Sequence, residues 1–258
     1  MTADGGPTAM EAEFDVVADW TRQAVRQLGD DHALPAACQG SASPAALDWL
    51  ARACGVTAGT RLLDVGGGTG GPAAYAARQF AARPLLIDPM PNACRTARDL
   101  FGLAAVVGTG EALPVATATL DAVWCLGVLC TTRERPRVLG ELRRVLRDGG
   151  SLGLLVFVAQ VTGVPDAPTG NDFPGQAELD GQIDEAGLVI VDRTHLDGLP
   201  AAPGSWSALA EGVQDAVERE HGRDPRYQQA QRQQERIARL LADGAVAGQL
   251  LHARAERR

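Results

Sequence analysis

The sequence contains no lysine, because all 24 of its basic residues are arginines. This absence excludes several α/β enzyme classes that need a lysine ammonium: P-loop nucleotidases, pyridoxal enzymes with a Schiff-base lysine, and short-chain dehydrogenases with a Tyr-x-x-x-Lys pair. Acidic residues outnumber the arginines by 32 to 24, which gives a formal charge of −8. Since binding along a phosphate backbone relies on positive charge, we expect no nucleic-acid partner.

Long apolar runs and paired cysteines are also missing. No apolar run approaches the roughly 20 residues that cross a bilayer, and the N-terminus is acidic and glycine-rich. We therefore expect a cytoplasmic protein without a membrane partner. The cysteines include no C-x-x-C pair, which argues against a disulfide framework and predicts no metal site; they are Cys38, Cys54, Cys94, Cys125 and Cys130.

Short apolar runs alternate with amphipathic segments through the middle of the chain. The runs predict strands at 61–65, 84–88, 104–107, 121–126, 151–159, 188–191 and 246–255. The intervening segments predict helices at 72–82, 92–101, 138–148 and 178–186. Several runs are continuously apolar, as in parallel strands that are covered on both faces. We therefore predict an α/β fold with a doubly wound, mostly parallel, seven-stranded sheet.

The first part of the chain is expected to be a helical lid. An amphipathic helix is predicted at 14–28, and a second helix begins at Pro44, with Ser43 as its N-cap. The stretch 30–40 between them is expected to be irregular. We assign residues 1–57 to this lid and residues 58–258 to the core.

Two more helices are predicted close to the C-terminal end, at 206–221 and 225–242. Because they precede the last predicted strand, we interpret residues 204–243 as a helical cap inserted into the core. The stretch 228–236 is rich in glutamine and arginine, and we expect it to be a solvated helix face.

A cluster of glycines follows the first predicted strand and leads into a helix. Glycines at this point permit a tight turn and let the backbone approach a ligand at the helix N-terminus. The spacing Gly66-x-Gly68-x-x-Gly71, with Asp88 further on, also fits a dinucleotide site, so an NAD-dependent oxidoreductase is one alternative. Asp64 favours a different ligand, because its carboxylate would repel a pyrophosphate and attract a cationic amino acid that carries a sulfonium.

The glycine cluster and the motifs that follow it resemble, in order and spacing, those of class I S-adenosylmethionine (SAM) dependent methyltransferases. The first motif of that family is similar to Asp64-x-Gly66-x-Gly68-x-Gly70. Its later motifs are similar to Ile87-Asp88, to Gly108-Thr109-Gly110-Glu111-Ala112-Leu113-Pro114, to the fourth strand at 121–129 and to the glycine turn at 141–150. The resemblance covers Arg61 to Phe157.

The resemblance implies a cofactor, SAM, and a set of residues that hold it. Asp88 would bind the ribose hydroxyls, and the 108–114 stretch would lie beside the adenine. The full set implied is Asp64, Gly66, Gly67, Gly68, Gly70, Asp88, Pro89, Thr109, Gly110, Glu111, Cys125 and Leu126. Thr109 stands where the family usually carries aspartate, and its hydroxyl is a weaker acceptor than a carboxylate.

The subgroup that the chain resembles methylates small molecules, as in quinone and natural-product biosynthesis. It implies methyl transfer to a small acceptor enclosed by the lid and the cap, in a monomer or homodimer. A SAM-binding cyclase or ligand-sensing protein would carry the same motifs, so both remain alternatives.

No catalytic residue can be carried over, because Cys130 and Thr131 replace a His-His pair often found there. The remaining candidates are His32, Cys130 and His195. A lone cysteine is also a common core residue, and SAM carries its own leaving group, so we expect positioning and desolvation to dominate catalysis.

Overall fold

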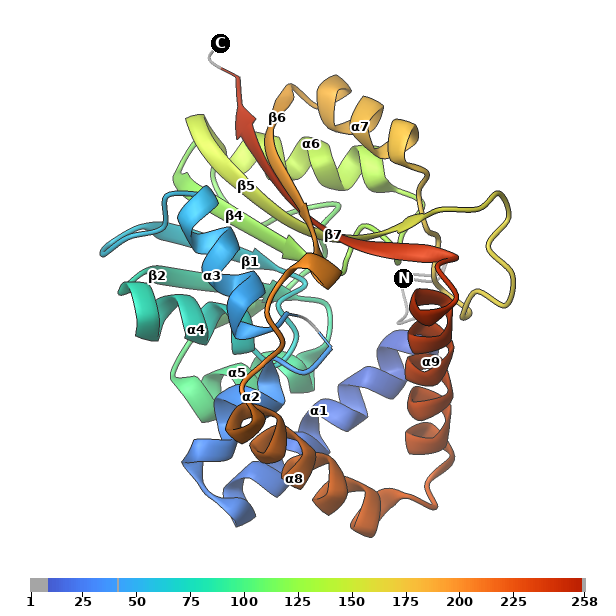
Figure 1. The fold of residues 1–258 in the computed structure, drawn as a ribbon. Helices are drawn as coiled ribbons and strands as arrows, with labels where there is room; N and C mark the ends of the chain where they lie inside the picture. The colour runs from blue at the N-terminus through green and yellow to red at the C-terminus, as the bar shows by residue number, and fades with distance from the viewer. Residues whose placement is uncertain (1–8, 41, 257–258) are drawn as a thin grey trace.

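One seven-stranded sheet, with the strand order β3-β2-β1-β4-β5-β7-β6, organises the protein (Figure 1). The structure is a computed structural model that describes residues 9–40 and 42–256. All neighbouring strands run parallel except β7, which is antiparallel to both β5 and β6. The predicted doubly wound, mostly parallel sheet is therefore confirmed. Its strands are β1 (Arg61–Val65), β2 (Arg83–Asp88), β3 (Ala104–Val107), β4 (Leu120–Leu126), β5 (Leu146–Ala159), β6 (Leu188–His195) and β7 (Val246–Ala255).

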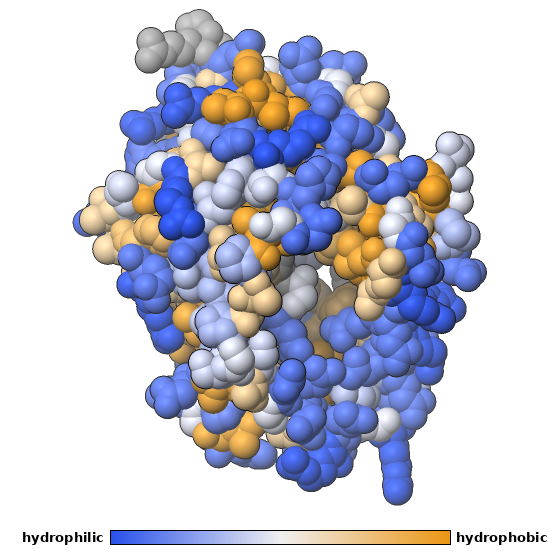
Figure 2. Space-filling model, in the orientation of Figure 1, coloured by the Kyte–Doolittle hydropathy of each residue, from blue (hydrophilic) through white to orange (hydrophobic). Residues whose placement is uncertain are grey.

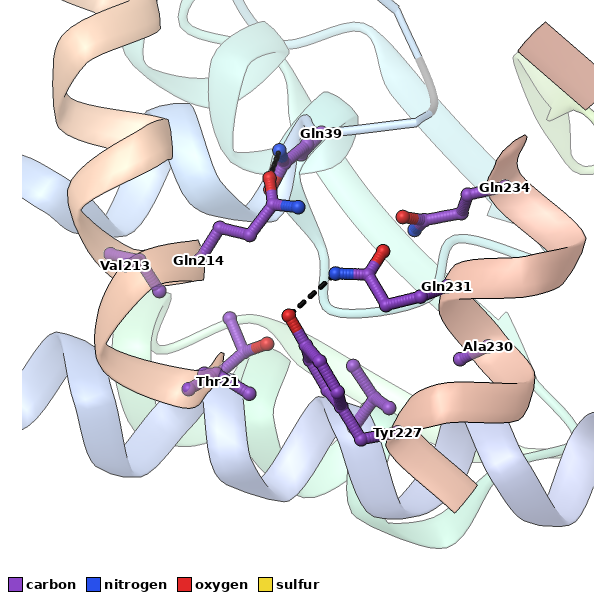
Figure 3. A pocket seen from close by; sticks show the side chains of 10 residues that line it. Thr21, Gln39, Val213, Gln214, Tyr227, Ala230, Gln231 and Gln234 are labelled. Carbon is purple, nitrogen blue, oxygen red and sulfur yellow. Dashed lines mark hydrogen bonds between the residues drawn. The ribbon is translucent and has the colours of Figure 1, made fainter. Parts of the chain in front are cut away.

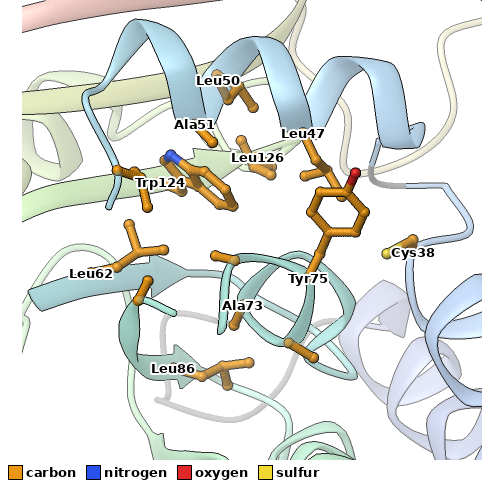
Figure 4. Close-up of a cluster of buried hydrophobic side chains, with 14 of the residues drawn as sticks. Cys38, Leu47, Leu50, Ala51, Leu62, Ala73, Tyr75, Leu86, Trp124 and Leu126 are labelled. Carbon is orange, nitrogen blue, oxygen red and sulfur yellow. The ribbon is translucent and has the colours of Figure 1, made fainter. Parts of the chain in front are cut away.

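Helices cover both faces of the sheet, because neighbouring residues of each strand point to opposite sides. Leu62 packs in one core cluster with Trp124 and with side chains of α3 (Pro44–Ala53) and α4 (Gly71–Phe80), as Figure 4 shows. Leu63, the next residue, packs in the opposite cluster. That cluster includes side chains of α6 (Arg135–Val145) and α7 (Gln176–Glu185). Helix α5 (Pro91–Phe101) connects β2 to β3.

The helices from the two ends of the chain pack together at one end of the molecule (Figure 1). A separate apolar cluster joins Trp20 and Val25 to Val213 and Val217. The Asp15 carboxylate also accepts the backbone N–H of Asn92 at 2.7 Å, which ties the first helix to the start of α5. The elements involved are α1 (Ala9–Leu28), η1 (Asp30–His32), α2 (Ala33–Ala37), α8 (Gly204–His221) and α9 (Pro225–Ala242); η2 (Leu196–Gly198) leads into α8.

The prediction of an irregular stretch at 30–40 is wrong, because the chain there forms η1 and α2. Every residue of α2 is buried, including Leu34 and Pro35. A five-residue helix is too short to show a periodic pattern, and short helices are held by tertiary packing rather than by their own propensity. Its existence therefore depends on partners that are remote in sequence.

Strand β5 begins at Leu146, five residues earlier than predicted, so α6 ends at Val145. The pairing with β4 jumps from Leu120↔Leu146 to Ala122↔Ser151. Such an irregularity accommodates extra residues in one strand, and the Gly149-Gly150 pair lies within it. Within the described residues, no helix combines the length and apolar content that crossing a bilayer requires.

Candidate active site

The loop between β1 and α4 is shaped by glycines. Gly66 has a φ of 67°, a conformation that side-chain-bearing residues rarely adopt. At Gly67 the constraint is space, because a Cβ atom would lie 2.7 Å from the Leu86 side chain and 2.8 Å from the Asp64 carboxylate. The loop therefore brings its bare backbone close to the end of β1, as a ligand cradle requires.

Asp64 is a buried acid at the floor of this loop. Its side chain is only 1% exposed, and neither carboxylate oxygen has a hydrogen-bond partner within the described part of the chain. Burial, and then the charge of Asp88, raise its pKa to about 7. The nearby backbone N–H of Ala73 lowers the pKa in part, although it is not placed to form a hydrogen bond with the carboxylate. A buried carboxylate without a partner is unfavourable, so a cationic ligand would relieve the cost.

Asp88 ends β2, next to the glycine loop. The β1–β2 register pairs Val65 with Ile87, so the two strand ends are neighbours. One Asp88 oxygen accepts the backbone N–H of Gly68 at 2.8 Å, and the other accepts that of Met90 at 2.9 Å. The carboxylate is 2% exposed. Asp88 thus fixes the loop relative to β2.

The other residues implied to hold SAM lie around these two acids. Cys125 pairs with Val65 across β1 and β4, and Leu126 follows it; both are buried at the end of β4. Burial, and then the Asp64 charge, raise the pKa of the Cys125 thiol. Half-buried residues of the loops after β2 and β3 complete the set: Pro89, Thr109, Gly110 and Glu111. The structure therefore brings the predicted residues to the ends of four adjacent strands, β3, β2, β1 and β4, and to the loops that follow them.

The three catalytic candidates do not converge. Cys130 is 2% exposed and donates its thiol to the Gly127 carbonyl at 3.2 Å, and burial raises its pKa to about 11. It is a packed, neutral thiol. His195 is exposed at the end of β6. His32 lies in η1 near Gly212 of α8, and its Nδ1 is buried without a hydrogen-bond partner among the described residues.

A cavity of about 490 Å³ lies beside the glycine loop and separates the sheet from the helical cover. Cys38 connects the two features, since it lines the cavity and a Cβ on Gly71 would lie 2.6 Å from its backbone nitrogen. The cavity is mostly apolar, and Glu211 is the only charged residue among the described residues that line it. Its larger apolar side chains are Pro35, Leu155, Phe157, Leu196, Leu199, Trp206 and Leu241.

Figure 2 shows a hollow in one face of the molecule, with hydrophobic residues along part of its border. Trp206 holds α8 against the core, because its ring meets Tyr75 edge-on with 6.3 Å between centroids. The Tyr75 hydroxyl in turn donates to Asp48 of α3 at 2.8 Å. None of His32, Cys130 and His195 is among the described residues that line this cavity.

Sequence reasoning missed most of the cavity wall. Leu155, Leu196 and Leu241 come from β5, η2 and α9, so no local pattern in the sequence connects them. Cys38 and Trp206 could be found as candidates, because each lies in a segment predicted to cover the core. Across residues 9–40 and 42–256, no three His, Cys, Asp or Glu side chains are grouped as a metal site would require.

Comparisons with known proteins identify methyltransferases as similar to this chain. Residues 63–154 match the family model described as a methyltransferase domain. The chain is 35% identical over 114 residues to "Methyltransferase GfsG" of Streptomyces halstedii, covering 42% of this chain and 41% of that protein. It is 31% identical over 172 residues to "Thiol S-methyltransferase TMT1A" of Homo sapiens, covering 64% of each. The chain thus spans less than two thirds of the length of either relative.

Among solved structures, the "[4+2]-Cyclase SpnF" superimposes with a TM-score of 0.66 and 25% sequence identity, covering 82% of this chain and 80% of that one. The sheet, the motif series and these similarities together define a class I SAM-dependent methyltransferase fold. The chain is similar to that family, and residues 63–154 match its methyltransferase domain. This similarity argues against the NAD-dependent alternative.

Proposed function

We propose that this protein transfers a methyl group from SAM to a small, largely apolar acceptor. The observation that carries the proposal is the position of Asp64: a buried carboxylate without a described partner, beneath a glycine loop and close to an apolar cavity. A cationic ligand satisfies the acid, and the adjacent cavity supplies room for a second molecule.

The residues present fit SAM. Asp64 and the backbone of Gly66 to Gly68 and Gly70 would hold its charged amino acid portion, and Asp88 would accept from its ribose hydroxyls. Thr109, Gly110 and Glu111 would lie along the adenine, and Pro89, Cys125 and Leu126 would border the ligand. When bound, SAM supplies a methyl group already attached to a good leaving group.

The protein's own contribution is then to orient the acceptor and to exclude water. Trp206, Leu196 and Phe157 provide an apolar wall, and residues of α2 and α8 line the same cavity. Burial raises the pKa of the Cys38 thiol, so the thiol stays protonated near neutral pH and does not act as a base. With Glu211 as the only described charged residue in the wall, the arrangement favours catalysis by positioning over general-base catalysis.

Two measurements test this function. Isothermal titration should detect SAM binding to the folded protein, and a panel of phenols, amines, thiols and carbon acids should include an acceptor that releases S-adenosylhomocysteine. On the best acceptor, we expect alanine at His32, Cys130 or His195 to lower turnover by less than about a hundredfold, the low end of general-base catalysis. No heat with saturating SAM would end the proposal. A loss beyond about a thousandfold at one position, with SAM affinity intact, would identify a base instead.

A second candidate is a SAM-dependent cyclase, favoured by the similarity to the cyclase SpnF. The same cavity could fold a substrate into a reactive shape, with the SAM sulfonium acting through its charge alone. Conversion of a substrate without release of S-adenosylhomocysteine would select this candidate over methyl transfer.

A further inference from the structure

Glutamine side chains face one another between α8 and α9. Gln39, Gln214, Gln231 and Gln234 line a small hollow of about 60 Å³, and Figure 3 shows their amide groups directed toward a common space. Three of these glutamines, with Tyr227, also line an open groove of about 640 Å³ between the two helices. The two hollows therefore share a wall of neutral amides.

The amides are already arranged by hydrogen bonds. Gln231 donates its Nε2 to the Tyr227 hydroxyl at 2.5 Å, and Gln39 donates its Nε2 to the Gln214 Oε1 at 2.8 Å. Each of these bonds uses one of the two N–H groups of the donor amide, and an amide oxygen can accept twice. The wall can thus donate hydrogen bonds to a ligand and accept them.

This polar wall continues from the acceptor cavity. Gln39 lines both the 490 Å³ cavity and the small hollow, so its bond to Gln214 stands at the junction between them. The apolar cavity and the small hollow share Gln39, and the small hollow and the groove share three glutamines and Tyr227, so the three hollows follow one another along α8 and α9. A single ligand that occupies both the apolar cavity and the groove must therefore pass the Gln39–Gln214 pair.

The charges of the groove do not favour an ionic ligand. Its described charged residues are Glu218, Glu235 and Arg232, so one arginine stands against two acids. An anion would meet two like charges, and a cation would meet the arginine. The amides, in contrast, suit hydroxyl and carbonyl groups.

We propose that the groove between α8 and α9 is a second subsite, which binds a neutral part of the acceptor that bears hydroxyl or carbonyl groups. The acceptor is then an amphiphile: its reacting end lies in the apolar cavity, and its neutral polar extension lies along the glutamines. The identification of the ligand as the acceptor rests on the proposed function, whereas the neutral polar subsite does not. The stretch 228–236 is accordingly a ligand-facing surface as well as a solvated one.

Binding of hexyl β-D-maltoside, a neutral polyhydroxyl head on a short apolar tail, tests the subsite. Its dissociation constant is measured by titration of the glutamine side-chain amide signals in NMR spectra, with 1-hexanol and hexyl phosphate as comparison ligands. We expect the maltoside to bind at least about fivefold more tightly than either. Gln231→Leu and Gln234→Leu should each weaken it by about fivefold, as expected for one lost hydrogen bond.

Gln229→Leu is the matched control. Gln229 lies on the same helix but is absent from the described lining of the three hollows, and it bonds to Arg232 instead. Gln231→Leu could weaken folding, because Gln231 donates to the buried Tyr227. Gln234→Leu tests the subsite without removing that hydrogen bond. Equal binding of maltoside and hexanol, tighter binding of the phosphate, or variants that match Gln229→Leu would each overturn the proposal. Because no turnover is needed, intact maltoside binding without any methyl transfer would refute the proposed function alone.

Discussion

The proposed cofactor side and the proposed acceptor side of this protein are built in opposite ways. Around Asp64 and the glycine loop the wall is backbone and buried acid, with no room for a Cβ at Gly67 or Gly71. Around the acceptor cavity the wall is made of side chains from the lid, β5, η2, α8 and α9. A backbone cradle fixes one ligand closely, whereas a side-chain wall can be altered residue by residue without disturbing the sheet.

The largest expected effect is at Asp88. Asp88→Ala removes two charge-assisted acceptors proposed for the ribose hydroxyls, so we expect SAM to bind about 100-fold more weakly by titration calorimetry. Asp88→Asn keeps one acceptor oxygen, which can serve the N–H of Gly68 or that of Met90 but not both as they are placed, and we expect an intermediate loss of about tenfold. Asp99→Ala, an α5 acid paired with Arg26, is the control. A change within about twofold for Asp88→Ala would show that the ribose lies elsewhere.

The close packing of the cofactor side should be visible in stability. A Cβ on Gly71 would lie 2.3 Å from the carbonyl oxygen of Ala37, so Gly71→Ala must push α2 away. We expect the free energy of unfolding in urea to fall by about 1–3 kcal/mol, as for overpacked sites. Gly181→Ala, in α7 with open space around it, should raise it by up to about 1 kcal/mol through helix propensity. Equal effects at both positions would mean that α2 is not held against the loop.

Burial of Asp64 predicts that SAM affinity depends on pH. Its pKa is raised to about 7, so the acid is mostly neutral at about pH 6 and a cation binds only its ionised form. We expect SAM to bind about tenfold more weakly near pH 6 than near pH 7.5, with proton release visible in buffers of different ionisation enthalpy. Higher pH is avoided, because the α-ammonium of SAM then begins to lose its proton.

The stability of the ligand-free protein should fall as the pH rises, whereas the affinity for SAM should increase. The pKa of Asp64 in the folded protein lies above its ordinary value of 3.8. The contribution of its protonated form to folding stability is therefore fully present below about pH 4 and is lost as the pH rises through about 7. Asp64→Asn should flatten both profiles. A pH-independent affinity in the unaltered protein would place the cation of SAM away from Asp64.

The same contrast explains which parts could be predicted from the sequence. Strand β1 and helix α9 were predicted with their observed bounds, and Ser43 caps α3 by accepting from Ala46 at 3.3 Å. These elements follow from local patterns: an apolar run before glycines, an Asp-Pro start, a Ser-Pro start. Helix α2 and the acceptor wall depend on contacts between remote segments, which no local pattern encodes.

Gln231 illustrates the remaining gap. In sequence it belongs to a polar stretch that fits a solvated helix face, and half of that interpretation holds, because Gln228 and Gln234 are exposed. What the sequence could not show is that α8 places Gln214 opposite α9, or that Tyr227 is buried beneath Gln231. A polar helix face becomes a binding surface only through the helix that faces it.

The smallest expected effect sharpens the comparison at the adenine end of the cofactor side. Thr109→Asp restores the acceptor usual in the family, and a carboxylate accepts an amino hydrogen more strongly than a hydroxyl does. The half-buried Glu111, two residues away, opposes a new negative charge, so we expect SAM to bind only about two- to fivefold more tightly. Thr109→Asn, neutral and of similar size, should change the affinity for SAM little.

Measuring 5′-methylthioadenosine beside SAM separates two causes of a gain in affinity, because the former shares the adenine but lacks the sulfonium. A gain for both ligands locates the introduced carboxylate at the adenine amino group. A gain for SAM alone would mean that this carboxylate attracts the sulfonium through space, and no gain would mean that position 109 faces away from the ligand.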